Sequence, residues 1–371
     1  TVTYYDEAGN ETGTYTWTAE TAPVVFINTV NGYAGSSRFS ITDCNSNIFY
    51  NDYISKGFIV VGVDSRGIGN SWGGATTLND DGVIVGKAPS GIVDLKAAVA
   101  FLKYNDDVLA GDSEKIVSQG YSAGGAMSAL LGATGDASEY DSYLKELGAA
   151  NASNSVYASQ VYCPITDLDN GDAAYEWLHM YQTSLVDWSG NAASFNDYQM
   201  ALHEAFIEYY VEYIQNLGFE LGDDGESGAY YDELTQKVVD ALNHAVQIGQ
   251  YKGSTITPGE IIASIASEGS GLAAYLAAND LKIEDVLSWD EAEQTFKLDS
   301  FKIFNLGGTF KRAKSVPALD GSIESGLFGA NGIAEDTSAH FSVSYLTVLQ
   351  KLMQSDNAEI AAKAKADYKA C

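Results

Sequence analysis

The stretch KIVSQGYSAGGAMSALL, residues 115–131, carries the change of pattern that decides the fold. Residues 115–119 form a short, largely apolar run typical of a buried strand, and from residue 126 onwards apolar residues recur with helical spacing. The Gly-x-Ser-x-Gly motif at residues 120–124 lies between the two patterns. A serine in such a strand-turn-helix setting projects its hydroxyl above the sheet. We therefore predict that Ser122 is a catalytic nucleophile, although a chain with 37 glycines can also form the motif by chance.

Backbone N–H groups around this turn are candidates for binding an oxyanion. The N–H group of Ala123, directly after the nucleophile, is the first. The second is expected from the loop after the first apolar run, which contains the pair Asn31-Gly32. We predict Gly32 as this donor, with Asn31 as the next choice, and an ordinary Asn-Gly turn is the alternative interpretation.

Three further apolar runs accompany residues 115–119, namely residues 23–29, 57–64 and 157–164. They are apolar throughout rather than alternating, as in the strands of a parallel sheet that is covered on both faces. Between the second and third runs, apolar residues recur with helical spacing over residues 92–102. Strands that alternate with helices predict an α/β fold with a parallel sheet and right-handed crossovers.

The character of the sequence changes after about residue 180. Long helices are predicted over residues 195–217 and 231–248. A third begins at Thr257, where a cap residue precedes a first-turn proline and a capping-box glutamate. No strand is predicted between residues 180 and 300. We interpret the chain as an α/β-hydrolase core over residues 1–177, a helical cap (lid) over residues 178–300, and a segment over residues 301–371 that returns to the core.

The chain of 371 residues has 20 basic and 50 acidic residues, which gives a formal net charge of −30. A surface this acidic repels phosphate groups, so nucleic acids and anionic membranes are not expected partners. No run approaches the roughly 18 consecutive apolar residues that cross a bilayer. We expect an extracellular or cell-surface protein, with the cytoplasm as the alternative.

No cofactor or metal is predicted. Cys44, Cys163 and Cys371 lack the spacing of zinc ligands, which leaves one disulfide or free thiols. Carboxylates cluster at residues 167–172 and 223–226, where calcium binding is one interpretation and solvated or helix-capping side chains are the favoured one.

The catalytic acid and base are harder to find than the nucleophile. A nucleophilic serine needs a histidine within hydrogen-bond reach and an acid that orients this histidine. In chains with the Gly-x-Ser-x-Gly motif, the acid follows the serine along the sequence and the histidine follows the acid. The histidines are His179, His203, His244 and His340. Only His340, preceded by Asp320, has the required order, and neither residue follows a strand-like run. We treat this pair as a weak candidate and expect the acid and base on polypeptide outside this sequence.

A set of short motifs extends along the chain. They are Thr21–Phe26, Gly32-Tyr33, Asp64–Gly67, Gly86–Pro89 with Asp94–Lys96, Gly120–Gly125, Leu131–Ala133, Tyr162–Asp169 with Ala174–Trp177, Val316–Asp320 with Leu327–Gly329, and His340-Phe341. In combination they resemble the bacterial tannase family, the tannin acyl hydrolases and related esterases of hydroxyaromatic acids. The resemblance covers nearly the whole chain and is densest over residues 57–177.

The resemblance implies an α/β-hydrolase sheet with a helical lid that hydrolyses galloyl or cinnamoyl esters, with Ser122 as nucleophile. In this family the triad Asp lies in a D-x-D segment after a late strand and the His lies near the C-terminus, and neither segment is present here. The family's opening strands also precede what is residue 1. We therefore expect a chain without the first and last strands, or one piece of a cleaved enzyme that a second polypeptide completes.

Aromatic and basic residues near the motifs are candidates for binding a small aromatic ester. Tyr121 adjoins the nucleophile, and Trp177 could line an aromatic acyl pocket. Packing in the core is the alternative interpretation of Trp177. Arg66 follows the second apolar run, where it could face a ligand or form a structural salt bridge.

Three functions are compatible with these patterns. The leading one is a carboxylic-ester hydrolase that forms an acyl-enzyme on Ser122. A serine peptidase of the prolyl-oligopeptidase kind shares the nucleophile turn, but the sequence has no propeller-like β repeats. A catalytically incomplete hydrolase-fold binding protein is the third, because no acid and histidine pair is convincing.

Overall fold

The computed structural model describes most of the chain, and the described residues form two compact units. The first unit extends to Leu168, and the second begins at Asp169 and includes the last two helices of the chain. The described residues are 1–6, 8–38, 48–68, 77–82, 85–164, 167–181, 184–186, 192–249, 255–267, 270–305 and 343–370.

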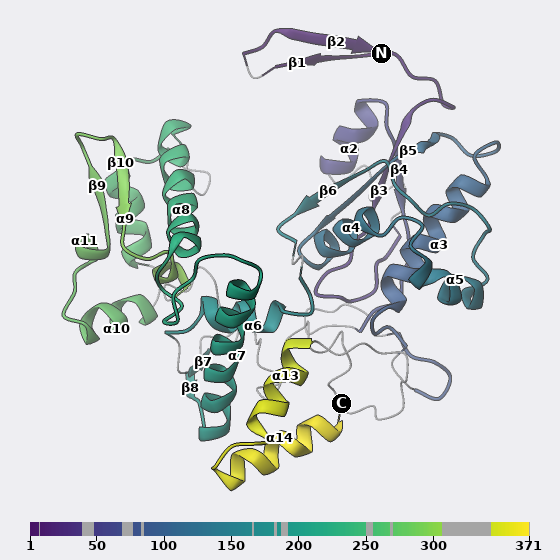
Figure 1. The fold of residues 1–371 in the computed structure, drawn as a ribbon. Coiled ribbons are helices and arrows are strands. Elements are labelled where there is room, and N and C mark those ends of the chain that lie inside the picture. The colour runs from purple at the N-terminus through teal and green to yellow at the C-terminus, as the bar shows by residue number, and fades with distance from the viewer. Residues whose placement is uncertain are drawn as a thin grey trace. The chain divides into compact units, whose positions relative to one another are not determined.

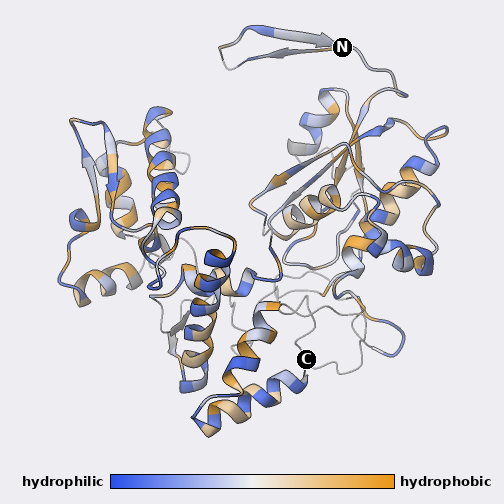
Figure 2. Cartoon of the chain, in the orientation of Figure 1, coloured by the Kyte–Doolittle hydropathy of each residue, from blue (hydrophilic) through white to orange (hydrophobic). Residues whose placement is uncertain are grey.

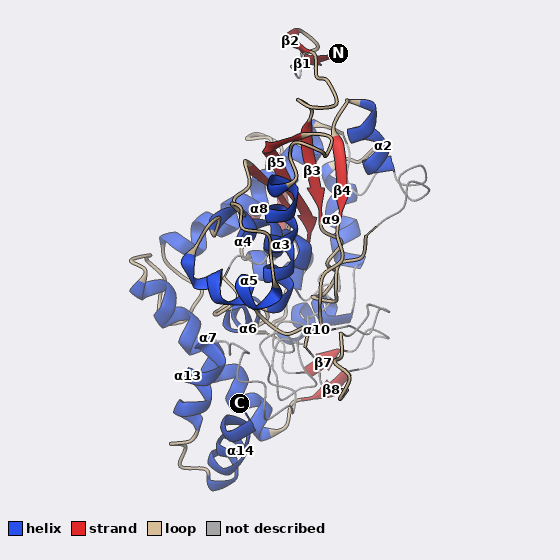
Figure 3. Ribbon diagram, turned by 90° about the vertical axis from the view of Figure 1, so that its right-hand side faces the viewer, coloured by secondary structure: helices blue, strands red, loops and turns tan. Residues whose placement is uncertain are grey.

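The centre of the first unit is a parallel sheet of four strands in the order β4-β3-β5-β6 (Figure 1, Figure 3). The strands are β3 (Pro23–Ile27), β4 (Ile59–Gly62), β5 (Asp112–Tyr121) and β6 (Ala158–Tyr162). In the register, Val25 of β3 lies opposite Val60 on one side and Val117 on the other. All four strands fall within the apolar runs or extend them, so the predicted α/β fold with a parallel sheet is confirmed.

Helices cover both faces of this sheet. They are α2 (Ile48–Ser55), α3 (Ser90–Tyr104) and α4 (Ala123–Ala133), with the 3-10 helix η1 (Ser138–Tyr140) and α5 (Asp141–Leu147) beyond them. On one face, the Ser159 hydroxyl of β6 donates to the Ser128 carbonyl of α4. The next residue of β6, Gln160, accepts from the Tyr53 hydroxyl of α2. Because successive strand residues point to opposite faces, α4 and α2 lie on opposite sides.

The core of the first unit lies between the sheet and helices α3 and α4. Phe26 and Ile116 from the strands and Leu95 and Leu131 from the helices are fully buried and pack in one cluster. Figure 2 shows the apolar colouring of α4 and of the strands beside it. Each such side chain contributes roughly 1.5–3 kcal/mol by leaving water. This burial fixes α4, and with it the turn that precedes α4.

A short antiparallel hairpin precedes the sheet, formed by β1 (Val2–Tyr5) and β2 (Glu11–Tyr15). The aromatic side chains of this hairpin contact Trp17. The Trp17 ring lies parallel to the Tyr15 ring, with 6.3 Å between the ring centroids. Trp17 in turn contacts the Phe58 ring at 5.4 Å. Sequence periodicity did not predict this hairpin, because its residues are mostly polar or aromatic.

Helices dominate the second unit. They are α6 (Gly171–Leu178), α7 (Asp197–Asn216), α8 (Ala229–Gln247), α9 (Pro258–Ser267), α10 (Ser270–Ala278), α11 (Ile283–Val286), the 3-10 helix η2 (Phe301–Asn305), α13 (Val343–Leu352) and α14 (Ala358–Ala370). The predicted capping box of α9 is confirmed, because Thr257 and Glu260 exchange backbone-to-side-chain hydrogen bonds. Gly218 follows α7 with a left-handed φ of 88°, the conformation that ends a helix.

The prediction that no strand lies between residues 180 and 300 was wrong. Two antiparallel hairpins occur there, β7 (Ser184–Val186) with β8 (Ala192–Ser194), and β9 (Leu287–Asp290) with β10 (Thr295–Leu298). Strands of three or four residues are too short to show alternation in the sequence. Packing holds the second hairpin, since the rings of Trp289 and Phe296 meet edge to face at 5.0 Å.

The division into units differs from the predicted boundaries at 177/178 and 300/301. Helix α6 belongs to the second unit, because it packs on α7. Helices α13 and α14 also pack on α7, and the Tyr345 ring of α13 is stacked with Phe206 of α7. The described part of the C-terminal segment therefore belongs to the helical unit.

None of the described helices is by itself long and apolar enough to cross a bilayer, whereas α9 and α10, which are bent by 88° relative to each other, together have sufficient length and apolar composition.

Lys96 is a fully buried cation in the first unit. Its ammonium donates to the Thr134 carbonyl at the end of α4 and to Asn154 Oδ1 at 3.0 Å, and it lies 4.5 Å from the centre of the Tyr140 ring. Burial lowers the pKa of Lys96 from 10.5 to about 8, and the charge of Asp136 opposes this shift.

We expect this lysine to make stability depend on pH. The unfolded chain keeps the Lys96 proton up to about pH 10.5 and the folded chain loses it near pH 8. Between these values the unfolded state binds more protons, so the free energy of unfolding rises with pH. Relative to Lys96→Met, the wild type should gain roughly 2 kcal/mol between pH 7.5 and pH 10, measured by urea unfolding. The exposed control Lys56→Met should keep the wild-type dependence, and equal slopes for wild type and Lys96→Met would contradict the prediction.

Candidate functional site

Ser122 occupies a one-residue turn between β5, which ends at Tyr121, and α4, which begins at Ala123. Its backbone is left-handed, with φ 54° and ψ −120°. Such a conformation costs a non-glycine residue of the order of 1–3 kcal/mol and persists only where surrounding contacts enforce it. The N–H group of Ser122 donates to the Tyr162 carbonyl at 2.9 Å, and its carbonyl accepts from Ala126 at 3.0 Å. The strained turn therefore exposes the Ser122 residue at the carboxyl end of β5.

The glycines of the motif are required by close backbone approach. A Cβ atom on Gly120 would lie 2.2 Å from the Gly124 carbonyl oxygen. One on Gly124 would lie 2.6 Å from Asn28 Oδ1 and 2.9 Å from the Val30 carbonyl oxygen. These separations are too short for real atoms, so any side chain at either position would force the turn open.

Asn28, at the end of β3, ties this turn to the neighbouring strand. Its Nδ2 group lies within hydrogen-bond distance of the Gln119 carbonyl at 3.2 Å, the Gly124 carbonyl at 3.1 Å and the Ser128 hydroxyl at 2.8 Å. Asn28 is 4% exposed. The sequence predicted no role for Asn28, which lies within the apolar run of residues 23–29. A lone polar residue at the end of an apolar strand was the available signal.

The loop after β3 carries the predicted second oxyanion donor. Gly32 and Tyr33 both have positive φ, 56° and 58°, and the Ala34 N–H group closes the turn on the Asn31 carbonyl at 3.1 Å. The same loop passes over Gly124 at Val30. The loop that contains Gly32 therefore lies beside the N-terminal end of α4, which begins at Ala123. The assignment of their N–H groups to an oxyanion stays a prediction.

The topology places this site at a switch point of the sheet. From β3 the chain moves outward to β4, then crosses back to β5 on the other side of β3. Ligands of open α/β sheets bind at the carboxyl edge beside such a switch point. Ser122 follows β5 and Gly32 follows β3, so both predicted groups lie at this edge.

Backbone packing also fixes the loop after β4. A Cβ atom on Gly67 would lie 2.0 Å from the Gly35 nitrogen, and one on Gly86 would lie 1.9 Å from the Gly67 carbonyl oxygen. Arg66 binds Asp94 of α3 through two side-chain contacts, at 2.8 Å from Nη2 and 3.0 Å from Nε. Arg66 therefore forms a structural salt bridge, one of its two predicted roles, and this ion pair joins the loop to α3.

The two predicted substrate-binding aromatics have different surroundings. Tyr121 is 44% exposed, and its ring is stacked on that of Tyr162 at 4.4 Å with an interplanar angle of 9°. Trp177 is 1% exposed in the second unit, where its Nε1–H group donates to the Gly225 carbonyl at 2.9 Å. The Lys302 ammonium lies 4.4 Å from the centre of the Trp177 ring. The structure shows the packing role of Trp177, and binding of substrate by either ring stays a prediction.

The candidate acid Asp320 and base His340 lie outside the described residues. The other three histidines belong to the second unit. His203 Nδ1 is 2.5 Å from Glu176 Oε2, and both side chains are buried. His179 Nδ1 is 2.8 Å from the Tyr175 carbonyl, and His244 lies on α8. The described residues place no histidine with Ser122 in the first unit.

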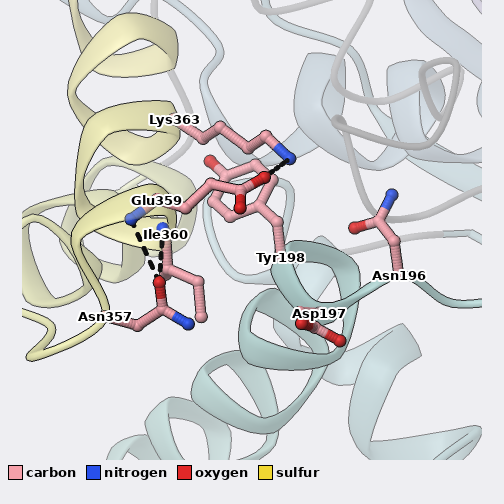
Figure 4. Close-up of a pocket in the computed structure, with 7 residues that line it drawn as sticks. All are labelled: Asn196, Asp197, Tyr198, Asn357, Glu359, Ile360 and Lys363. Atoms are coloured by element: carbon pink, nitrogen blue, oxygen red, sulfur yellow. Dashed lines mark hydrogen bonds and ion pairs between the residues drawn. The ribbon is translucent and has the colours of Figure 1, made fainter.

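A cavity of about 210 Å³ lies in the second unit between the first turns of α7 and α14 (Figure 4). Asn357 accepts from the N–H groups of Glu359 and Ile360 there, and Lys363 pairs with Glu359 at 3.0 Å. These groups satisfy one another as helix caps and surface ion pairs. The cavity therefore contributes no nucleophile and no predicted site residue.

In the acidic cluster at residues 223–226, neighbouring groups donate hydrogen bonds to the Asp224 carboxylate. Asp224 accepts from the Glu226 N–H group at 2.8 Å and from the Ser227 hydroxyl, which lowers the pKa of Asp224. Within the described part of the chain, no group of three or more His, Cys, Asp or Glu side chains is arranged to hold a metal ion.

Comparison with known proteins agrees with this geometry. The BD-FAE family model matches residues 17–209, more than half of the chain, including the sheet and the Ser122 turn. The chain belongs to the BD-FAE family. No curated protein matches it.

This BD-FAE member is also similar to solved tannases. A tannase from Fusobacterium nucleatum is 26% identical, with a TM-score of 0.68 over 95% of this chain and 68% of the other. A tannin acyl hydrolase in complex with ethyl gallate is 26% identical, with a TM-score of 0.62 over 84% and 63%. A tannase from Lactobacillus plantarum is 26% identical, with a TM-score of 0.61 over 84% and 64%. The BD-FAE chain thus spans about two thirds of the length of these enzymes, and the predicted tannase-like α/β-hydrolase fold is confirmed.

We predict that Gly124→Ala destabilises the first unit strongly. The added methyl group must displace Asn28 and the Val30 carbonyl, which costs about 1–3 kcal/mol or more. A matched control is Gly259→Ala in the first turn of α9, where a Cβ atom would meet nothing within 4 Å. The control should be neutral or slightly stabilising because alanine favours helix. Urea unfolding measures both, and equal effects would contradict the steric argument.

We also predict that Asn28→Ala lowers the free energy of unfolding by about 1–3 kcal/mol, because buried acceptors lose their donor. Asn105→Ala is the control, since its side chain also donates to a backbone carbonyl but on the surface. We expect a change within about 0.5 kcal/mol for this control. A loss at Asn28 no larger than at Asn105 would show that the tie between β3 and the Ser122 turn is unimportant.

Proposed function

We propose that this chain is a serine carboxylic-ester hydrolase that acts on esters of hydroxyaromatic acids. The observation that carries the proposal is the left-handed, exposed Ser122 at the carboxyl end of β5. This is the conformation in which a serine on a strand-to-helix turn serves as a nucleophile. Membership of the BD-FAE family supports the same reaction class.

The proposed reaction proceeds through an acyl-enzyme. The Ser122 oxygen attacks the ester carbonyl carbon while a histidine takes the hydroxyl proton. The N–H groups of Ala123 and Gly32 stabilise the negative oxygen of the tetrahedral intermediate. The intermediate collapses, and the histidine protonates the departing alcohol. Water, deprotonated by the same histidine, then releases the acid and restores Ser122.

The histidine and its acid are placed outside the described residues. They are either His340 and Asp320 or residues on further polypeptide, in which case a second chain or segment completes the site. This chain spans 68% and 63% of the length of two similar tannases.

The substrate class follows from similarity and from the aromatic surface beside the nucleophile. One tannin acyl hydrolase with this fold was solved with ethyl gallate and another crystal contained 3,4-dihydroxybenzoate. In this chain, the partly exposed Tyr121 ring adjoins Ser122. A planar hydroxyaromatic acyl group can stack on or against such a ring. We therefore propose galloyl and cinnamoyl esters ahead of aliphatic ones.

We expect a fluorophosphonate probe to label Ser122 in the native protein and not in Ser122→Ala. The same variant should lose at least about 10³-fold in kcat/KM for methyl gallate or methyl ferulate, because no other group can form the acyl-enzyme. Ser142→Ala, an exposed serine on α5, is the matched control and should keep full activity.

Intact mass under denaturing conditions and a binding assay separate the alternatives. Labelling together with a second co-purifying polypeptide supports a site completed by that polypeptide. Binding of methyl gallate without labelling or turnover would instead favour a catalytically incomplete binding protein. Cleavage of peptide nitroanilides in preference to esters would favour the peptidase.

A further inference from the structure

A chain of hydrogen bonds lies on the face of the sheet opposite α4, behind the nucleophile turn. The Tyr53 hydroxyl of α2 donates to Gln160 Oε1 at 2.9 Å, and the Gln160 amide donates to the Tyr162 hydroxyl. Since Gln160 and Tyr162 are two residues apart on β6, their side chains leave the sheet on the same face. Three side chains from two elements are thus joined in one line.

Tyr162, the last of the three, contacts Ser122 and also Tyr121, the residue before it. Its carbonyl accepts the N–H group of Ser122 at 2.9 Å. Its ring is stacked on Tyr121, the residue before the nucleophile, at 4.4 Å between ring centroids. The orientation of Tyr162 is therefore coupled to Ser122 through a backbone hydrogen bond and through a ring contact.

The surroundings of the Tyr53 hydroxyl, the first donor in this series of hydrogen bonds, keep it protonated. Burial raises the pKa of Tyr53, and proximity to the Tyr162 and Tyr121 phenols raises it further. The Tyr53 hydroxyl therefore stays protonated at neutral pH and can donate to Gln160. Because Gln160 Oε1 accepts this hydrogen bond, the NH₂ group of the same amide points toward the Tyr162 hydroxyl.

We propose that Tyr53 and Gln160 are positioning residues for Ser122, acting through Tyr162. The reason is the strain of the turn, since a left-handed serine is maintained only by contacts that outweigh its backbone cost. Asn28 provides such contacts on the β3 side, and the chain from Tyr53 provides them on the β6 side. The catalytic part of this inference rests on the proposed function.

The test uses the whole chain and the variants Tyr53→Phe, Gln160→Leu and their combination. We expect kcat for methyl gallate to fall about tenfold in each, with KM within twofold of wild type. The double variant should be no slower than Gln160→Leu, because Tyr53 acts only through Gln160. Tyr162→Phe, which keeps the ring contact and removes the oxygen that accepts from Gln160, should match Gln160→Leu. Tyr157→Phe, an exposed tyrosine before β6, is the control and should have no effect.

Hydrogen exchange of the segment 119–127 gives a readout that does not need activity. We expect faster exchange there in Gln160→Leu and Tyr53→Phe, with unchanged exchange in Tyr157→Phe. Unchanged exchange in both variants, additive losses in the double variant, or a raised KM with normal kcat would each overturn the proposal. If the wild type neither takes the fluorophosphonate label nor turns over ester, the proposed function fails, and the exchange result alone decides the positioning role.

Discussion

The close approach between the end of β3 and the turn after β5 is the constraint on which the site depends. Gly124 has no room for a side chain because Asn28 and the Val30 carbonyl occupy the space, and Asn28 binds the carbonyl of Gly124. This contact holds the first turn of α4 against β3. The chain between Gly120 and Gly124 then has one way to change direction, and Ser122 takes the left-handed conformation.

The same principle builds the rest of the carboxyl edge. Backbones at Gly35, Gly67 and Gly86 stack at distances that exclude any Cβ atom. The Arg66–Asp94 ion pair joins the second of these loops to α3. The described parts of the loops after β3 and β4 thus pack directly on each other, and the loop after β3 also packs on the turn of Ser122. The proposed stabilisation of an oxyanion requires N–H groups that are held in place in this way.

Buried cations organise both units in a similar way. Lys96 joins α3 to the end of α4 and to Asn154 before β6. In the second unit, Lys302 lies over Trp177 and donates to the Gly225 carbonyl, and burial lowers the pKa of Lys302 to about 8. Each ammonium satisfies carbonyl groups that would otherwise be buried without a donor, and aromatic rings replace part of its hydration. Trp177 is therefore a structural partner of Lys302 in this unit.

The sequence by itself determined the four strands of the parallel sheet and the long helices, and it predicted Ser122 as the nucleophile, because these inferences depend on local periodicity and on one short motif. Residues 115–131 predicted β5, Ser122 and α4 together, and the capping box at Thr257 predicted the start of α9. Only the tertiary structure revealed the role of Asn28, the Tyr53–Gln160–Tyr162 chain, the hairpins of the helical unit and the membership of α6 in that unit. These features join residues distant in sequence or occupy three or four residues, and neither leaves a periodic pattern. The physical reason is that the periodicity of a sequence indicates which face of a helix or strand is buried. Which other element covers that face is determined only by the tertiary structure.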